Sequence, residues 1–493
     1  MSPRLIPKDE AIAILPCEGL PPVTVIGTDK IRSTFDEVCL QQAINSRQSP
    51  GVSNVVLNPD GHLGYGAPIG CVMSSPTHIY PGPVGVDIKC SMSLLQTDIP
   101  EEAVQDKVIR RALIDAICKR IPTGAGKGQR SVAKSRDVPL TAVMTGLVQG
   151  ATANVLEQMG VPAEWANRCE DSVHHGHDGS SDALEARLDW HLVNNTFFDL
   201  EKKLNQVGSL GGGNHFGECE IVHLEDNARA RNAAEVFGLQ DGRVAFLSHC
   251  GSRGIGHNLA AAQFKTLQAL FRTWKIPFPG NDPQLVYAPL GTPEADAYID
   301  DMSIGANFAT LNHLLINSLV LEAFQEVLPG TKGEMVYLIS HNIARRELVD
   351  GKMEWVHRKG ATRAFPAGHP GLAKTRYADS GHPILLPGNP QAGSVVMVAD
   401  PNAKISSYSV NHGAGRRMGR KHAMRELKQD RVDQSFANSD ILTNCRNYPK
   451  DEAPEVYKDF DEVLKSVKLA GLASEVARLK AKFVIKDGDA ADD

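Results

Sequence analysis

The 493-residue sequence has few cysteines, no long hydrophobic run and no excess of positive charge. Its nine cysteines form no regular spacing pattern and include no Cys-x-x-Cys pair, which favours reduced thiols in a cytoplasmic protein. No stretch approaches 18 uninterrupted apolar residues, and the first residues have no apolar core of a signal peptide. The sequence therefore predicts neither a membrane span nor a signal peptide.

The overall charge excludes one broad class of nucleic-acid-binding protein. The chain has 52 Lys+Arg and 58 Asp+Glu, a formal net charge of −6, so it is no bulk polycation. Binding to nucleic acid would have to use local basic patches. A hydrophobic fraction of 42% and a charged fraction of 22% are typical of a globular protein, which excludes disorder and fibrous repeats for the chain as a whole.

The chain shows no low-complexity linker and no repeat of fixed period, and its 44 Gly and 29 Pro predict many tight turns. Apolar periodicity predicts helices over 102–120, 182–206 and 303–327, and shorter helices within 457–480. Short apolar runs predict buried strands at 244–247, 335–339, 384–386 and 395–398. This mixture predicts an α+β (mixed α/β) fold with one large catalytic domain over 1–486, followed by an acidic tail over 487–493.

Three segments place a histidine after an extended apolar run and an arginine four residues later. The pairs are His249 with Arg253, His341 with Arg345, and His412 with Arg416. A strand end holds a catalytic or ligating group rigidly, and arginine suits a phosphate. One such segment is most often a structural histidine, but three of them favour a shared site.

Two further segments offer ligands for a metal. Asp87 and Cys90 lie three residues apart, and His215 follows a glycine-rich turn and Asn214. Carboxylate, thiolate and imidazole together suit Zn²⁺, Mn²⁺ or Fe²⁺. The alternative is that Asp87 is a turn residue and Cys90 a small buried hydrophobic residue, and Asp-x-x-Cys alone does not decide between the two.

Other patterns are weaker. The His-rich stretch 174–177 lies in a polar region and is not expected to be the main metal site, and 124–128 lacks P-loop spacing. Lys-x-Asp-Gly, the lysine-nucleophile signature of familiar ligases, is absent. Basic residues cluster in 119–136, 357–363 and 416–428, which are either solvated faces or the walls of a phosphate-binding groove.

Taken in order, these segments resemble the RtcB family of GTP-dependent tRNA-splicing and RNA-repair ligases. The resemblance runs over roughly residues 50–486. It is carried by the motifs Pro59-Asp-Gly-His62, Gly85-Val-Asp-Ile-Lys-Cys90, Leu210-Gly-Gly-Gly-Asn-His-Phe216, Ser248-His-Cys-Gly-Ser-Arg253, Ser340-His-Asn342, His357-Arg-Lys-Gly-Ala-Thr-Arg363, Asn411-His-Gly-Ala-Gly-Arg416 and Asp451-Glu-Ala-Pro454.

The resemblance implies a set of site residues. The ligands of two Mn²⁺ ions would be Asp87, Cys90, His215, His249 and His341, with Cys90 bridging. His412 would be the histidine that attacks the α-phosphate of GTP, with Asp60 near it. The guanine would be held by Glu218, Ser394, Tyr457 and Lys486, the phosphates by Asn214, Arg253 and Asn342, and the nucleotide also by Gly413, Ala414, Gly415 and Arg416.

The implied reaction joins an RNA 3′-phosphate or 2′,3′-cyclic phosphate end to a 5′-hydroxyl end through a guanylylated histidine. The small protein archease is an implied partner, and DNA ends are an alternative substrate. Capping of 3′-phosphate ends with GMP without sealing, and a metal-dependent phosphoesterase, remain alternatives. A non-catalytic RNA-binding module is disfavoured by the complete ligand set. This chain departs from the usual family pattern at Lys89, Ser91, 208–215, His313, 387–390 and 165–180.

Overall fold

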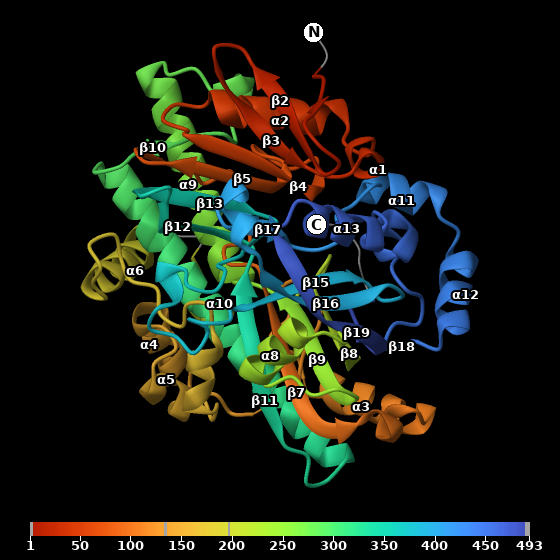
Figure 1. Cartoon of the computed structure of the whole chain (residues 1–493). Helices are drawn as coiled ribbons and strands as arrows, with labels where there is room; N and C mark the ends of the chain where they lie inside the picture. Colours follow the sequence, from red (N-terminus) through yellow and green to blue (C-terminus); the bar gives the residue numbers. More distant parts are fainter. Residues whose placement is uncertain (1–2, 133–135, 196–197, 489–493) are drawn as a thin grey trace.

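Two large β-sheets dominate the structure, a computed structural model that describes residues 3–132, 136–195 and 198–488 (Figure 1). The first sheet has seven strands in the order β1-β2-β3-β4-β5-β13-β12, antiparallel except for the parallel β3/β4 pair. Their bounds are β1 Ile6–Pro7, β2 Ile12–Cys17, β3 Leu20–Ile26, β4 Asn54–His62, β5 Ile69–Ser75, β12 Asn342–Val349 and β13 Lys352–Lys359.

The second sheet has eight strands. Seven follow the order β11-β7-β9-β8-β19-β16-β15, and β18 pairs with β19 in parallel. Their bounds are β7 Ser91–Pro100, β8 Phe216–Leu224, β9 Arg243–Cys250, β11 Gly333–Ser340, β15 Pro383–Asn389, β16 Gly393–Ala399, β18 Leu442–Thr443 and β19 Ala473–Ile485. Two small sheets pair β6 His78–Ile79 with β10 Ala288–Pro289, and β14 Ala361–Arg363 with β17 Ser409–Asn411.

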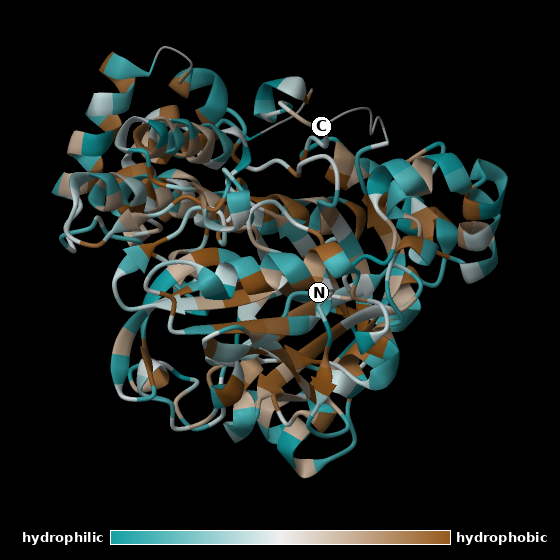
Figure 2. Ribbon diagram, turned by 90° about the horizontal axis from the view of Figure 1, so that it is seen from above, coloured by the Kyte–Doolittle hydropathy of each residue, from teal (hydrophilic) through white to brown (hydrophobic). Residues whose placement is uncertain are grey.

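Helices lie mainly on the outside of these sheets, and brown hydrophobic strands fill the interior in Figure 2. Their bounds are α1 Asp29–Arg32, α2 Glu37–Gln48, α3 Lys107–Cys118, α4 Leu140–Gln149, α5 Ala153–Gln158, α6 Asp182–Asn194, α7 Leu200–Leu204, α8 Ala228–Phe237, α9 Arg253–Trp274, α10 Pro293–Val327, α11 Arg420–Glu426, α12 Gln429–Ser439 and α13 Phe460–Leu469. One buried cluster, which includes Val56, Val72, Ile384, Val395 and Leu464, joins both large sheets and α13 into one core.

Helix α10 lies at the centre of a second buried cluster of apolar side chains. It packs against α3, α4, α6 and α9. By length and apolarity it could cross a membrane, but 94% of its most apolar window is buried inside the protein. The helix is therefore a core helix: it is hydrophobic on all sides because the interior of the domain surrounds it.

The predicted mixture of helices and strands is confirmed, and each of the four predicted strands lies within β9, β11, β15 or β16. The predicted helix at 102–120 is α3, preceded by a short 3₁₀ turn at Glu101–Val104. The third predicted helix, α10, begins ten residues earlier than expected, at Pro293, where Thr292 caps it by accepting from the N–H of Ala295.

Two helix predictions are wrong in part. The helix expected over 182–206 is two helices, because α6 ends at Asn194 and Asn195 has non-helical angles; residues 196 and 197 lie outside the described residues. The helical stretch expected over 457–480 holds only for α13. From Ala473 the chain is strand β19, which pairs with both β8 and β16, so central sheet pairing overrides its helix-favouring Ala, Glu, Leu and Lys residues. Of the predicted acidic tail, residues 489–493 lie outside the described residues, and the boundary at 486 stays a prediction.

Candidate active site

The sheet topology brings the predicted ligands together at one end of four adjacent strands. Strand β7 runs antiparallel to both β9 and β11, so its start lies beside their ends: Ser91 pairs with Cys250 on one side and with Ser340 on the other. Strand β8 also begins there, with Phe216 opposite His249. Residues immediately before β7 and β8, and at the ends of β9 and β11, therefore meet although they are far apart in sequence.

These residues form two overlapping groups that could each hold a metal ion. One group is Cys90, His249 and His341, and the other is Asp87, Cys90 and His215, with the ligand atoms of each group within 4.8 Å of one another. Cys90 Sγ lies 3.1 Å from His249 Nε2 and 3.5 Å from His215 Nε2. The shared thiol is the arrangement expected of a sulfur that bridges two ions.

The protonation states of these side chains fit metal ligation. Burial and the neighbouring histidines hold the pKa of His249 and of His341 well below the usual range, so both rings are neutral. The Nε2 atoms of these two rings lie 3.2 Å apart. His249 Nδ1 lies 3.1 Å from the carbonyl oxygen of Asn214, to which it donates, so its Nε2 presents a lone pair to the cluster.

The acidic members of the cluster also fit a cation. Burial opposes ionisation of Asp87, but hydrogen bonds from His215 and Cys90 and the charges of His215 and Arg253 together outweigh it and lower the pKa of Asp87 to about 2. Burial and the adjacent Asp87 raise the pKa of the Cys90 thiol well above its usual range. Burial opposes protonation of His215, but the neighbouring Cys250 and Asp87 raise the pKa of this ring to about 9, so a bound cation would replace its proton. A thiol, a carboxylate and imidazoles converging in a buried site form a donor set suited to a divalent transition metal.

His412 lies next to this cluster and is oriented by Asp60. The ring centroids of His412 and His341 are 4.8 Å apart. Asp60, fully buried at the end of β4, accepts from the backbone N–H of His412 at 3.1 Å and has Oδ2 only 2.6 Å from its Nδ1. Because a carboxylate accepts, Nδ1 carries the proton and Nε2 keeps its lone pair.

The loop after His412 packs closely on its surroundings. A Cβ on Gly415, whose φ is +73°, would lie 2.3 Å from the carbonyl oxygen of Asp60. A Cβ on Gly413 would lie 2.7 Å from that of Pro387. Glycine at these positions therefore lets the backbone beside His412 approach both Asp60 and the strand β15.

A pocket lies between the ends of β8, β15 and β19. It is lined by Phe216, Glu218, Pro387, Gly388, Asn389, Pro390, Tyr448, Glu452, Tyr457 and Lys486. Three of the four residues expected to hold a guanine, Glu218, Tyr457 and Lys486, are among them. Ser394 does not line the pocket, but its buried hydroxyl has no hydrogen-bond partner among the described residues.

Glu452 lies in this pocket, although the sequence pattern did not assign it a role there. It accepts from the hydroxyl of Tyr457 at 2.6 Å and forms ion pairs with Lys486 and Arg416, each at 3.1 Å. Burial opposes its ionisation, but the Lys486, Arg420 and Arg416 charges lower the pKa of Glu452 to about 2. The motif 451–454 contained the signal, but the sequence did not show which residues would meet it.

The predicted phosphate-contacting residues lie around the cluster and differ in their exposure and their hydrogen bonds. Asn214 is exposed beside His215. Arg253 begins α9 and donates to the carbonyl of Gly124 at 2.9 Å, and Asn342 lies at the start of β12, where its Oδ1 accepts from the N–H of Gly360 at 2.8 Å. The spacing predicted that Arg345 binds a phosphate, but in the structure its guanidinium pairs with Asp171 at 2.9 Å.

The His-rich stretch 174–177 is used in structural contacts. His174 lies 2.7 Å from Lys89 Nζ, and His177 lies 2.9 Å from Asp300. Within the described ranges, neither histidine belongs to a group that could hold a metal.

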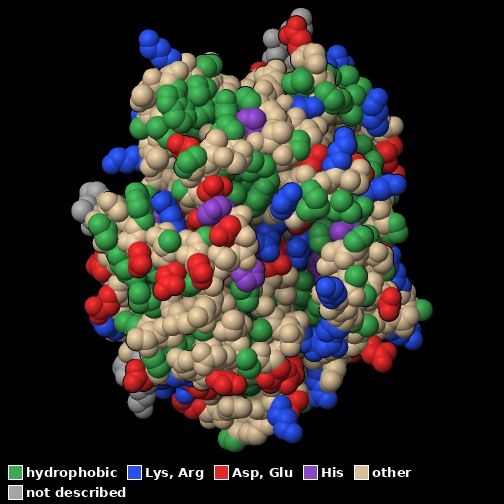
Figure 3. All heavy atoms as spheres, turned by 90° about the vertical axis from the view of Figure 1, so that its left-hand side faces the viewer, with side chains coloured by type: hydrophobic (Ala, Val, Ile, Leu, Met, Phe, Trp, Pro, Cys, Tyr) green, Lys and Arg blue, Asp and Glu red, His purple; other side chains and the backbone are tan. Residues whose placement is uncertain are grey.

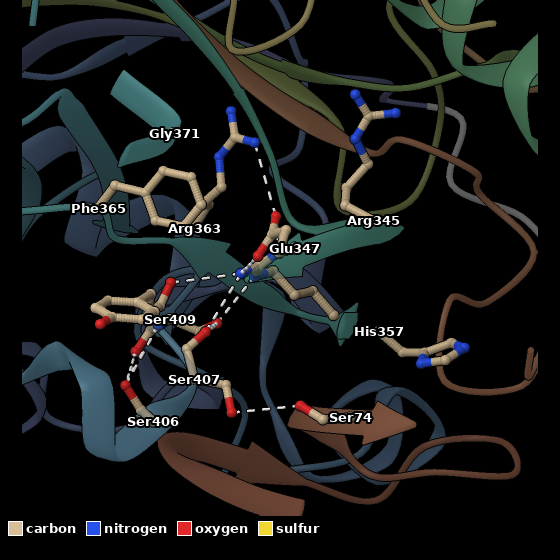
Figure 4. A network of polar contacts seen from close by, with 12 residues as sticks. Ser74, Arg345, Glu347, His357, Arg363, Phe365, Gly371, Ser406, Ser407 and Ser409 are labelled. Carbon is tan, nitrogen blue, oxygen red and sulfur yellow. Dashed lines mark hydrogen bonds and ion pairs between the residues drawn. The ribbon is translucent and has the colours of Figure 1, made fainter. Parts of the chain in front are cut away.

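A second buried network lies under the site: the guanidinium groups of Arg358 and Arg363 both reach Glu347, and Arg358 also donates to Ser409 on β17 (Figure 4).

Comparison with known proteins gives one consistent family. The family model described as tRNA-splicing ligase RtcB matches residues 42–487. The tRNA-splicing ligase RtcB of Aeropyrum pernix is 33% identical over 98% of this chain and 97% of its own length. Those of Thermococcus kodakarensis and Nanoarchaeum equitans are 34% and 33% identical, over 91% and 99% of this chain and 90% and 100% of their own lengths. The chain therefore belongs to the RtcB family.

Proposed function

We propose that this protein is an RNA ligase that uses GTP and two Mn²⁺ ions to join 3′-phosphate or 2′,3′-cyclic phosphate ends to 5′-hydroxyl ends. The observation that carries the proposal is the position of His412. Its ring lies 4.8 Å from that of His341 in the candidate metal cluster, and Asp60 fixes Nδ1, so Nε2 is the nitrogen available for attack. A nucleophile beside a cation site is what transfer of a nucleotide requires.

His412 would act first. Its Nε2 lone pair forms a bond to the α-phosphorus of GTP while the bond to pyrophosphate breaks, and the proton on Nδ1 stays on the side of Asp60 throughout. The positive charge that develops on the ring is stabilised by the Asp60 carboxylate at 2.6 Å. Asp60 thus performs the orienting role of the third member of a catalytic triad.

Asp87, Cys90, His215, His249 and His341 would hold the metal ions. When bound, these ions mask phosphate charge and so allow a neutral nucleophile to approach phosphorus. The pocket lined by Glu218 and Tyr457 would hold the guanine, because a carboxylate accepts from both N–H donors on the guanine edge.

The remaining steps transfer GMP and then release it. An oxygen of the RNA 3′-phosphate attacks the His412-bound phosphorus and the N–P bond breaks, which regenerates the imidazole. A 5′-hydroxyl oxygen then attacks the activated 3′-phosphate, loses its proton, and displaces GMP. A 2′,3′-cyclic end must first take up water to give a 3′-phosphate.

The surface fits a polyanionic substrate locally, although the protein is acidic overall. Helix α11, at the right of Figure 1 and eight residues after His412, carries the exposed cations Lys421 and Arg425. Such patches attract phosphodiester backbones irrespective of sequence. The opposite face, shown in Figure 3, is hollowed near its middle, where Lys, Arg and His side chains lie beside Asp and Glu.

The test is a labelling and sealing assay. Purified protein and the His412→Ala variant are incubated with Mn²⁺ and GTP labelled at the α-phosphate, and then with RNA carrying a 3′-phosphate and a second strand carrying a 5′-hydroxyl, with and without archease. A covalent label on wild type alone, followed by joined RNA, is expected. A guanylylated RNA end that is never sealed would instead establish a capping enzyme. Phosphate release that needs no GTP would establish a phosphoesterase.

We also propose a cytoplasmic location. The candidate ligand Cys90 is free in the structure, and it must stay reduced to bind metal. Localisation of a tagged chain in its own cell tests this.

A further inference from the structure

We propose that Lys89 ties the metal-binding loop 87–90 to segment 169–174, and that this tie positions Asp87 and Cys90 for metal. The tie comprises Lys89, Asp171, His174 and Thr310. The proposal rests on the proposed function only in taking Asp87, Cys90 and His341 as metal ligands. Lys89 touches no reacting atom, so its role is that of a positioning residue.

The backbone of Lys89 has an unusual conformation between two ligands. Its φ is +53°, in the left-handed region that a side chain with a Cβ disfavours. Its N–H donates to the carbonyl of Asn342 at 2.7 Å, and its carbonyl accepts from Ser91 Oγ at 2.7 Å. The turn therefore connects the loop to the residue that follows the ligand His341.

The side chain of Lys89 is fully buried, and its amine is surrounded by polar partners. Nζ lies 2.8 Å from the carbonyl oxygen of Asp171, 2.7 Å from His174 Nε2 and 2.6 Å from Thr310 Oγ1. The carbonyl of Asp171 and Thr310 Oγ1 accept from the amine. Because the Arg345 guanidinium donates to His174 Nδ1, Nε2 of this ring carries the proton and lies against the amine as its third polar neighbour. A buried amine with this many partners is held in one place, since any movement leaves a polar group without a partner.

Segment 169–174 is itself fixed to the second ligand-bearing strand. The N–H of Glu170 donates to the carbonyl of Leu338 at 2.8 Å, and its carboxylate accepts from the N–H of Ser340 at 3.0 Å, one residue before His341. Arg363 pairs with Glu170 at 3.0 Å. The segment thus covers the edge of β11, the outermost strand of its sheet.

Arg345 completes the tie from β12. It pairs with Asp171 at 2.9 Å, and its guanidinium lies 2.8 Å from His174 Nδ1. Figure 4 shows the Arg345 and Arg363 side chains extending to the same side of the strands that carry them. His174 is also held by α10, because its N–H donates to Asn307 Oδ1 at 2.8 Å. The partners of Lys89 are therefore rigid.

These contacts link the two segments of the chain that carry candidate metal ligands. Asp87 and Cys90 flank Lys89 in the chain, His341 precedes its backbone partner Asn342, and segment 169–174 contacts both Lys89 and strand β11. If the amine contacts are removed, the loop keeps its backbone bonds but loses its only side-chain anchor at position 89. Metal ligands need supporting contacts of this kind to keep their geometry.

The test compares metal affinity in Lys89→Asn, Thr310→Val and Arg110→Met with that of the full-length wild type. Asn is the substitution of choice because it tolerates the left-handed backbone, so it removes the amine contacts alone. Arg110→Met is the matched control: Arg110 is also a fully buried cation, but its partners are Asp440 and the backbone carbonyls of Gln105, Asp440 and Lys482, none of which is a candidate ligand. Mn²⁺ binding is titrated, and Co²⁺ is substituted to record the absorption band of its bond to thiolate.

In Lys89→Asn, the Mn²⁺ affinity should fall 10- to 100-fold, and the Co²⁺–thiolate band should weaken or shift. Thr310→Val should change both in the same direction but less, and the double variant should be no worse than Lys89→Asn, because both disrupt one tie. Arg110→Met should lower the unfolding temperature without changing either readout.

Wild-type affinity and an unchanged band in Lys89→Asn, with a wild type that binds metal, would overturn the tie and leave the proposed function standing. A wild type that binds no Mn²⁺ or Co²⁺ would overturn both. If Lys89→Asn does not fold, Thr310→Val decides: an unchanged metal affinity in that variant overturns the proposal.

Discussion

Nδ1 of His412 lies 2.6 Å from Oδ2 of Asp60, which leaves Nε2 as the ring nitrogen that Asp60 does not contact. Asp60 has no solvent exposure, and its other oxygen, Oδ1, has no hydrogen-bond partner among the described residues. One oxygen of this carboxylate therefore serves both the ring and the backbone of His412, which fixes the tautomer and the direction of the ring together.

Asp60→Asn should preserve the fold and slow attachment of GMP to His412. The amide oxygen of Asn can accept from the backbone N–H and from Nδ1 as Oδ2 of Asp60 does, but it carries no negative charge to stabilise the positive charge that develops on the ring. The rate of adduct formation with labelled GTP should fall by about 10²- to 10⁴-fold. The metal content and the unfolding temperature serve as controls and should stay close to those of wild type. Labelling at the wild-type rate would show that the charge of Asp60 does not assist the attack.

Cys90→Ala should lose both metal ions, or nearly so, because Cys90 is the one residue common to both candidate groups. Elemental analysis of protein purified with Mn²⁺ measures this directly. Cys219→Ala is the control, since Cys219 is equally buried in β8 but belongs to neither group. Full occupancy in Cys90→Ala would contradict the bridging role, and the loss of one ion alone would make Cys90 a ligand of a single metal.

Guanosine binding should weaken in acid because of Glu218. Burial raises the pKa of Glu218 to about 7, and the pKa of its neighbour Glu220 lies well above the usual range for the same reason, so Glu220 keeps its proton. The guanine edge requires an ionised Glu218, and that form is lost as pH falls through 7. Affinity should be about tenfold lower at pH 6 than at pH 8.

Guanosine is the appropriate probe for this effect, because it carries the base without a phosphate that would engage His412 or the metal ligands. In Glu218→Gln, affinity should be low and independent of pH over the same range. An equally steep pH dependence in that variant would assign the titration to another group.

The exposed cations after His412 should contribute to RNA affinity in a salt-dependent way. Lys421, Arg425 and Lys428 have no ion-pair partner among the residues that the structure describes, which leaves them available to phosphates. Replacing all three with Ala should reduce the slope of log affinity against log salt by about 2, at roughly 0.7 per single-strand phosphate contact.

A matched variant replaces the exposed Lys8, Lys265 and Lys352, which lie on other elements and change the net charge equally. If both triple variants show the same slope as wild type, RNA does not contact α11. If both lower it equally, the effect belongs to net charge and not to this helix.

Much of the fold follows from local sequence patterns. The apolar runs that became β9, β11, β15 and β16 are short and rich in β-branched residues, and both features favour buried strands. For residues 473–485 the local pattern predicted the wrong element, because their Ala, Glu, Arg and Lys residues favour a helix. They form the central strand β19 only because β8 and β16 provide hydrogen-bonding edges on both sides.

The sequence by itself determined the chemistry available to this protein. Histidines at strand ends, a thiol three residues from a carboxylate, and glycines around His412 are properties of the chain, and their ordered spacing was enough to indicate the family. Tertiary structure decided which of these groups meet. The antiparallel register of β7 with β9 and β11 brings Cys90 to His249 and His341, and long-range packing placed Glu452 in the pocket beside Tyr457 and His174 against Lys89. Contacts between residues tens to hundreds of positions apart depend on sheet register and burial, and neither is encoded by the local pattern around a single residue.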